Sequence, residues 1–253
     1  MKPSGLSRVL IALGGASPSR PALETGVGLA AAIGAALDAL FVEDASLLRL
    51  GALPFASETS ALTGARRALG AGEMERALRV EAAQLERLLA QAAARRQVPW
   101  SFAVTRGQLL TEAMRRDADL IVFGAQTHAT PPVNEPEPSG PVTAVFDASP
   151  EALRTLAATT QLARALTRSL LILVPPEKRA PQRAAHQQAR DWLQAEQVAG
   201  LVVTMDSGER ALVGAVRARR SGLLALPASV LDLWPVELAA LVAGIACPLV
   251  IVR

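Results

Sequence analysis

Apolar residues along this chain fall into short uninterrupted runs, and these runs are separated by longer segments with helical spacing. Residues 104–126 show both patterns. Leu109, Leu110, Ala113 and Met114 recur at helical spacing, and residues 120–123 (LIVF) then form a wholly apolar run. Such a run is typical of a parallel strand that is covered on both faces. Ligands of open parallel sheets lie just beyond the carboxyl ends of the strands, so Gly124 marks where a site should begin.

The same alternation continues along the whole chain and predicts an α/β fold with right-handed crossovers and a parallel sheet. Residues 45–70 are expected to be irregular. Strands are expected at residues 8–13, 37–42, 100–105, 120–123, 142–146, 170–174, 201–205, 223–226 and 248–252. Helices are expected at residues 21–36, 73–96, 151–167, 181–197, 209–220 and 235–245, and in a short segment after Gly107.

A restart of this pattern indicates an internal repeat. The tripeptide Ala-Ser-Pro at residues 16–18 recurs at residues 148–150, and TPPVNEPEPSG at residues 130–140 has the composition of an extended linker. The chain is therefore predicted to contain one unit at residues 1–130, a Pro-rich linker at 131–140, and a second unit at 141–253.

Charge and composition narrow the classes of partner. The net charge is only +3, the cations are mostly arginines scattered in pairs, and aromatic residues make up 3% of the chain, which argues against nucleic acid. No apolar run reaches the roughly 18 residues that a membrane span requires. The first 15 residues have too short an apolar core for a secretory signal. With a lone cysteine, Cys247, these features predict a cytoplasmic protein.

Three motifs resemble the universal stress protein family. VFDAS at residues 145–149 is close to the family pattern Val-Asp-Gly-Ser, and residues 107–124 follow the pattern Gly, helix, Ala-Asp-Leu-Ile-Val-x-Gly. ACPLVIVR at residues 246–253 is similar to the usual family ending. The resemblance implies an α/β fold of two doubly wound parallel-sheet units in tandem. The first unit would lack its last helix and strand, because the linker follows Gly124 at once.

In ATP-binding members of this family, the site combines an Asp after strand one, the end of strand two and a glycine loop after strand four. That loop reads Gly-x-x-Gly, then about nine residues, then Gly-Ser or Gly-Thr, and its glycines let backbone N–H groups approach phosphates. By this resemblance, a nucleotide would be held by Gly14, Gly15, Val42, Gly124, Asp147 and Val174.

Neither unit carries the full pattern. The first unit has Gly14 where the Asp should stand and departs from the loop after Gly124, while the second keeps Asp147 but has Pro227 and Ala228 in place of glycines. The resemblance therefore implies a member that has lost ATP binding, and no cofactor is expected.

Two of these positions also have a purely structural interpretation. Asp147 either holds an adenine or ribose group or caps the helix after Pro150. Gly14 and Gly15 either cradle an anion in a nest of backbone amides or form a tight turn. The structural interpretation is favoured at both places.

No catalytic or metal-binding constellation is visible. His128 and His186 lie too far apart for a metal cluster, and Cys247 is expected to be a small buried apolar residue. The acidic pair at residues 43–44 and Glu112 have the chemistry of a general acid or base but show no partner in the sequence.

The sequence therefore predicts a non-enzymatic stress-response or regulatory protein that acts through protein contacts. The alternative is a protein that binds ATP or AMP through a variant loop and hydrolyses it slowly. A third class, an adenylyl-transferring relative, would need a His-x-x-His motif, which this sequence lacks.

The expected partners of this chain are inferred from the open edges of its predicted sheets. The fourth strand of the first unit would lie at an open edge, which we expect the second unit or another chain to cover. Residues 248–252 are a second candidate for an open apolar edge. Because the last strand often joins partners in this family, we expect a homodimer.

Overall fold

Nine strands form one sheet in the computed structural model, which describes residues 6–14, 19–46, 49, 57–59, 66–68, 71–124, 140–176, 182–206, 208–229, 241 and 244–253. In chain order the strands of this sheet are β1 (Arg8–Gly14), β2 (Ala36–Asp44), β5 (Trp100–Gly107), β6 (Leu120–Phe123), β7 (Val142–Val145), β8 (Leu170–Val174), β9 (Gly200–Thr204), β10 (Leu223–Pro227) and β11 (Leu249–Val252).

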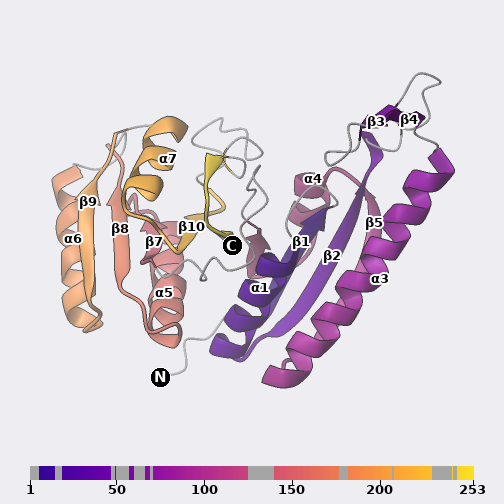
Figure 1. Cartoon of the computed structure of the whole chain (residues 1–253). Coiled ribbons are helices and arrows are strands. Elements are labelled where there is room, and N and C mark those ends of the chain that lie inside the picture. Colours follow the sequence, from indigo (N-terminus) through magenta and orange to yellow (C-terminus); the bar gives the residue numbers. More distant parts are fainter. Residues whose placement is uncertain are drawn as a thin grey trace.

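The strand order across the sheet is β5-β2-β1-β6-β11-β10-β7-β8-β9 (Figure 1). We call β5, β2, β1 and β6 the first array, and β9, β8, β7, β10 and β11 the second array. Every neighbouring pair is parallel except β6 and β11, which are antiparallel. The predicted α/β fold and the parallel pairing within each array are thus confirmed.

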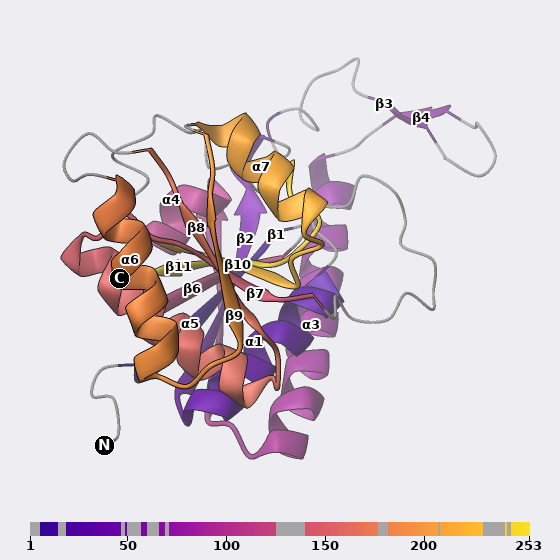
Figure 2. The ribbon, with the colours of Figure 1, turned by 90° about the vertical axis from the view of Figure 1, so that its left-hand side faces the viewer.

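Helices cover both faces of the sheet. One face is covered by α1 (Ser19–Ile33), α3 (Ala71–Arg96), α5 (Pro150–Ala165) and α6 (Gln182–Ala195), which contribute to one apolar core. The other face is covered by α4 (Leu109–Met114) and α7 (Glu209–Ala218), which contribute to a second core. Figure 2 looks along the row of strands and shows them fanned out by the twist of the sheet, with α4 and α7 above and α1 and α5 below.

The strands form where the sequence predicts them because their side chains are buried on both faces. All residues of β6, β7, β8, β10 and β11 are buried. Helix α1 is shorter than predicted and ends at Ile33, because Gly34 adopts the left-handed conformation with φ of 69°.

Residues 45–70 are not wholly irregular, and here the prediction was wrong. Strands β3 (Ser57–Thr59) and β4 (Arg66–Ala68) pair antiparallel in a small separate sheet. These strands are three residues long and carry no apolar alternation that would have revealed them.

The antiparallel pair β6–β11, which we call the seam, joins the two arrays into one sheet. Phe123 lies opposite Leu249 and Leu120 opposite Val252. The prediction that the open edge of the fourth strand is covered is confirmed, and the second half of the same chain covers it. The prediction that residues 248–252 form an open edge was wrong, because β11 lies between β10 and β6.

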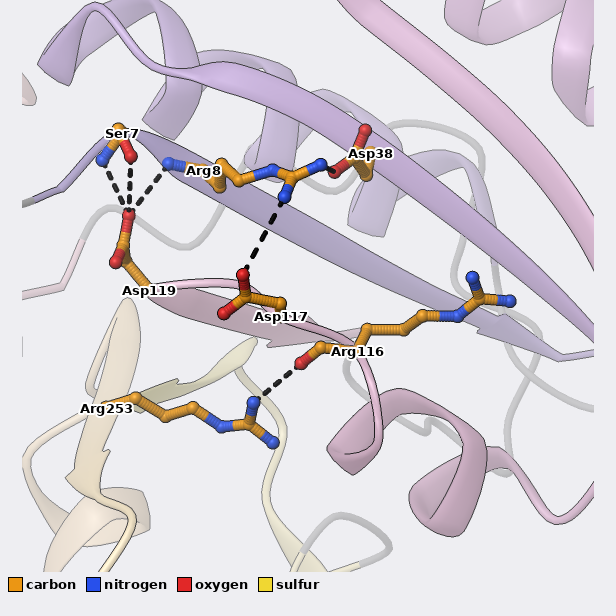
Figure 3. Close-up of polar contacts among 7 residues, drawn as sticks. All are labelled: Ser7, Arg8, Asp38, Arg116, Asp117, Asp119 and Arg253. Atoms are coloured by element: carbon orange, nitrogen blue, oxygen red, sulfur yellow. Dashed lines mark hydrogen bonds and ion pairs between the residues drawn. The ribbon is translucent and has the colours of Figure 1, made fainter.

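A polar cluster fixes one end of the seam (Figure 3). The Oδ2 atom of Asp119 accepts hydrogen bonds from the backbone N–H groups of Ser7 and Arg8, at 2.7 and 2.9 Å, which ties the start of β1 to the start of β6. The Arg253 guanidinium donates to the carbonyl oxygens of Arg116, at 2.6 Å, and of Met114, while its backbone N–H donates to the Asp119 carbonyl. The Asp of the Ala-Asp-Leu-Ile-Val motif is therefore structural in this protein.

Some predicted segments lie outside the described residues. They include residues 131–139 of the linker, Gly15, His128 and most of the helix predicted at residues 235–245. Among the residues that are described, no helix is long and apolar enough to cross a membrane.

Candidate functional site

Three of the predicted site residues meet at the carboxyl ends of neighbouring strands in the first array. Gly14 ends β1 and lies directly opposite Val42 of β2. Gly124 follows β6, whose last residue, Phe123, lies opposite Ala12 of β1. Gly14, Val42 and Gly124 therefore occupy the position at which parallel sheets bind ligands.

An apolar side chain stands against this position. A Cβ atom built on Gly14 would lie 3.6 Å from a methyl carbon of Leu109, the first residue of α4. Leu109 packs with the core on that face of the sheet. Gly14 thus faces a leucine methyl group, and it supplies no carboxylate that could bind an adenine or a ribose.

The acidic residue at the end of β2 is held by an arginine. Glu43 is buried, and its Oε2 atom accepts a hydrogen bond from Nε of Arg106 on β5 at 2.7 Å. Another nitrogen of the same guanidinium group, Nη2, donates a hydrogen bond to Oε1 of Glu75 on α3 at 3.1 Å. The hydrogen bond and the charge of Glu43 raise the pKa of Arg106 above its ordinary value. This carboxylate neutralises a structural arginine and is not a free general base.

Sequence reasoning missed this ion pair. Glu43 and Arg106 lie 63 residues apart and become direct neighbours only in the register of β2 and β5. The signal that was available is that each charged residue directly follows at least four uncharged residues of its strand, near the carboxyl end. The other acidic candidate, Glu112, pairs with Arg115 one helical turn away at 2.9 Å.

The remaining two predicted residues lie in the second array. Asp147 follows β7, and Val174 ends the neighbouring strand β8. The Oδ1 atom of Asp147 accepts a hydrogen bond from the Ser149 N–H at 3.0 Å, and Ser149 in turn accepts from the Ala152 N–H at 3.1 Å as the N-cap of α5. Ser149 is thus the cap, and Asp147 shapes the turn that precedes it.

The turn at Asp147 carries backbone strain. Ala148 adopts a φ of 61°, in the left-handed region, at the position where the family pattern has glycine. Replacement of Ala148 by Gly is expected to raise the free energy of unfolding by up to about 1 kcal/mol, because glycine adopts this conformation without steric cost.

Urea denaturation followed by circular dichroism measures this change. Ala152→Gly, in the first turn of α5, is the matched control and should lower the free energy of unfolding by about 1 kcal/mol. A loss of stability in Ala148→Gly would contradict the strain argument.

At the end of β10, residues 227 and 228 offer no free backbone N–H group to an anion. Pro227 has no N–H group, and the N–H of Ala228 already donates to the carbonyl oxygen of Val252 at 2.9 Å. A phosphate cradle requires backbone N–H groups that are free to point at the ligand. The two described positions that stand where the family has its first glycines therefore supply none.

The five described site residues do not form one constellation. Gly14, Val42 and Gly124 belong to the first array, whereas Asp147 and Val174 belong to the second, and the strand direction reverses between them at the seam. Each array presents its own set of carboxyl ends, so the candidate residues form two separate groups.

Cys247 is buried beside the seam, in the segment that leads into β11. Its side chain is 1% exposed, and burial raises the pKa of its thiol to about 12. The expectation of a buried apolar cysteine is confirmed. Such a thiol is not nucleophilic, because the thiolate is the reactive form.

A thiol reagent tests this environment. Native protein at pH 8 is expected to leave Cys247 unmodified by an aromatic disulfide reagent, whereas protein unfolded in guanidinium should release one equivalent of chromophore. The same batch of protein provides both measurements, and complete reaction in the native state within minutes would contradict the burial of the thiol.

Other chemical features are sparse in the described part of the chain. No group of three or more His, Cys, Asp or Glu residues there is placed to hold a metal ion. An open hollow of about 320 Å³ lies at the amino ends of β7, β8 and β9, with Leu170, Gly200 and Arg219 among its lining residues. The hollow thus lies at the edge of the second array opposite to Asp147 and Val174.

Comparison with solved structures identifies the fold. A universal stress protein from Archaeoglobus fulgidus DSM 4304 is similar over 97% of this chain and 96% of its own, with a TM-score of 0.61 and 11% sequence identity. A putative universal stress protein from Pseudomonas aeruginosa UCBPP-PA14 matches over 98% of this chain and 93% of its own, with a TM-score of 0.52 and 10% identity. The chain thus has the fold of universal stress proteins.

A functionally unknown protein from Pseudomonas aeruginosa PAO1 is similar to the same extent. The match covers 98% of this chain and 92% of that one, with a TM-score of 0.51 and 9% identity. No family model matches the sequence, and no curated protein matches it.

Proposed function

We infer that this chain is a tandem universal stress protein in which both nucleotide sites have degenerated, and that it works in stress response or regulation through contacts with other proteins. Its units span residues 1–130 and 141–253, joined by the Pro-rich segment 131–140. It carries out no catalysis and resides in the cytoplasm.

The repeated strand order supports two units. The first array reads β5-β2-β1-β6 and the second reads β9-β8-β7-β10, so the third, second, first and fourth strands of each half follow the same order. Helices α1 and α5 follow the first strands of the two halves, and α4 and α7 precede the fourth strands. Strand β11 has no counterpart in the first half among the described residues.

The proposed loss of nucleotide binding depends chiefly on one observation, the lack of free backbone N–H groups at residues 227 and 228 after β10. A proline without an N–H group precedes an alanine whose N–H is already bonded to Val252. In the first half, Gly14 faces Leu109, and Glu43 is neutralised by Arg106. At these described positions, the groups that would recognise a nucleotide are thus replaced by apolar contacts or used within the protein.

Isothermal titration calorimetry with ATP, ADP and AMP tests the proposal. We expect no heat of binding at micromolar concentrations of protein and nucleotide, while a nucleotide-binding universal stress protein in the same buffer serves as the positive control. Micromolar affinity for any of the three nucleotides would reject it.

Asp147 favours a second candidate, an adenine-nucleotide-binding protein with a variant loop, because this carboxylate is retained at the end of β7. A ligand that binds only the folded state raises the apparent stability. Under this alternative the melting temperature would rise with nucleotide concentration, and Asp147→Asn would abolish the rise.

A further inference from the structure

We propose that the outer edge of β5 pairs antiparallel with β5 of a second copy of this chain, in the register centred on Ala103. The proposal does not depend on the proposed function. Strand β5 is eight residues long and ends the sheet, with α3 alongside it (Figure 1). In the described part of the chain, no strand pairs with its outer side.

Backbone direction determines which residues face outward. In a parallel pair, alternate residues direct both their N–H and C=O groups toward the neighbouring strand. The Leu37 N–H donates to the carbonyl oxygen of Pro99 at 2.9 Å, so the odd-numbered residues of β5 face β2. The even-numbered residues, from Trp100 to Arg106, therefore present their N–H and C=O groups to a partner.

A register centred on Ala103 places these outward groups opposite one another. Trp100 of one copy then lies opposite Arg106 of the other, and Phe102 lies opposite Val104, so all four positions become hydrogen-bonded pairs. Ser101 and Thr105 lie opposite each other at the intervening positions. A shift by one residue in either strand would align outward groups with inward ones and lose the ladder.

The side chains are complementary in the same register. Trp100 is 38% exposed and Val104 is 50% exposed, which is high for large apolar residues in a strand. They share one face with Phe102 and Arg106, because Phe102 packs with the core that α3 covers and Arg106 bonds Glu75 of α3. The pairing thus sets an arginine over an indole ring and a phenylalanine beside a valine, which are two favourable cross-strand contacts.

A second copy fits this edge better than the other end of the sheet does. In WSFAVTR, two polar residues (Ser101 and Thr105) and two apolar residues (Phe102 and Val104) are placed symmetrically about the central alanine. A two-fold axis therefore pairs like with like at these positions in both strands. Strand β9, at the opposite end, has five residues and one exposed large apolar side chain, Leu201. Short edges are protected from pairing, and the residues of β5 before Arg106 include no charge or proline.

Cysteine cross-linking tests the register. Across the two-fold axis, the Cα atoms of residue 103 would lie about 4.5 Å apart, a distance that disulfides span. Ala103→Cys is expected to form a covalent dimer on mild oxidation. Thr105→Cys is the matched control on the same face, because its two copies would lie roughly 13 Å apart. The buried Cys247 stays silent, and the wild type gives the background.

A pair of charge variants tests the contact in solution. Trp100→Lys and Trp100→Glu each remove the indole ring from the contact. Each should weaken the dimer at least tenfold in analytical ultracentrifugation, with no preference for either sign of charge, because Glu43 and Glu75 already neutralise Arg106. Leu201→Lys on β9 should leave the dimer mass unchanged. Because both side chains are exposed, circular dichroism should show that each of the three variants is folded.

The supporting result is a dimer that Ala103→Cys traps, that Thr105→Cys does not trap, and that both Lys and Glu weaken at residue 100. A wild type that stays monomeric up to high micromolar concentration would overturn the proposal. Equal cross-linking of the two cysteine variants, a dimer that both Trp100 variants leave unchanged, or loss of the dimer in Leu201→Lys would each overturn it as well. Species larger than a dimer would indicate pairing of β5 with β9 and would also refute it.

Discussion

Replacement of Phe123 by Ala is expected to lower the free energy of unfolding by about 3–5 kcal/mol, which is the usual cost of deleting a buried phenylalanine ring. Phe123 is 1% exposed and lies on β6 opposite Leu249 of β11. Its ring belongs to the core on that face of the sheet, which includes side chains from both arrays. The cavity would therefore open at the seam.

Urea denaturation measures the loss. Leu201→Ala provides the matched control, since Leu201 is 52% exposed and its truncation should change the free energy of unfolding by about 0.5 kcal/mol or less. Two-state analysis requires that fluorescence and circular dichroism give the same transition. A change below 1.5 kcal/mol in Phe123→Ala would mean that the seam repacks easily.

Replacement of Gly140 by Ala is expected to destabilise the fold by about 1–3 kcal/mol or more, in the range that overpacking produces. A Cβ atom at residue 140 would lie 1.7 Å from the carbonyl oxygen of Arg220. The obstacle is backbone, and the same stretch is tied by the hydrogen bond from the Gly222 N–H to the Pro141 carbonyl at 2.9 Å. Neither strand start can move aside without breaking this contact.

Gly214→Ala is the matched control for this prediction. Gly214 lies within α7, and a Cβ atom there would meet nothing within 4 Å. The same substitution should therefore stabilise the protein by about 0.5–1 kcal/mol, because alanine favours the helix. Opposite signs for the two variants in thermal and urea denaturation are the expected outcome, and equal signs would contradict the steric argument.

Most elements of the fold could be predicted from the sequence because burial on both faces leaves a strong local pattern. Strand β8 begins and ends where the apolar run LLILV does, and β6 coincides with LIVF. Helix α3 was predicted within two residues of its start, since leucines at helical spacing run along its length. These patterns depend on local burial, and the sequence records them directly.

Contacts between distant segments were harder to predict. The seam follows from no periodicity, because an apolar run such as PLVIV pairs equally well in either direction and on either edge. The ion pair of Glu43 with Arg106 depends on lateral register, which the sequence does not show. The hairpin of β3 and β4 is too short to leave a pattern.

The candidate site was located in part. The sequence placed Gly14, Val42 and Gly124 at the ends of strands, and the structure brings them together. It assigned Asp147 and Val174 to the second half of the chain, and these two residues lie in the second array. The engaged N–H of Ala228 was also invisible, since it depends on the position of β11.

The seam also bears on how the chain is made. Strand β6 ends at residue 123, whereas its partner β11 begins at residue 249. During synthesis, the unpaired apolar edge of β6 leaves the ribosome long before the strand that covers it, and such edges promote aggregation. A nascent chain of this protein thus needs temporary shelter for one strand until the ribosome has translated the distant segment that completes the sheet.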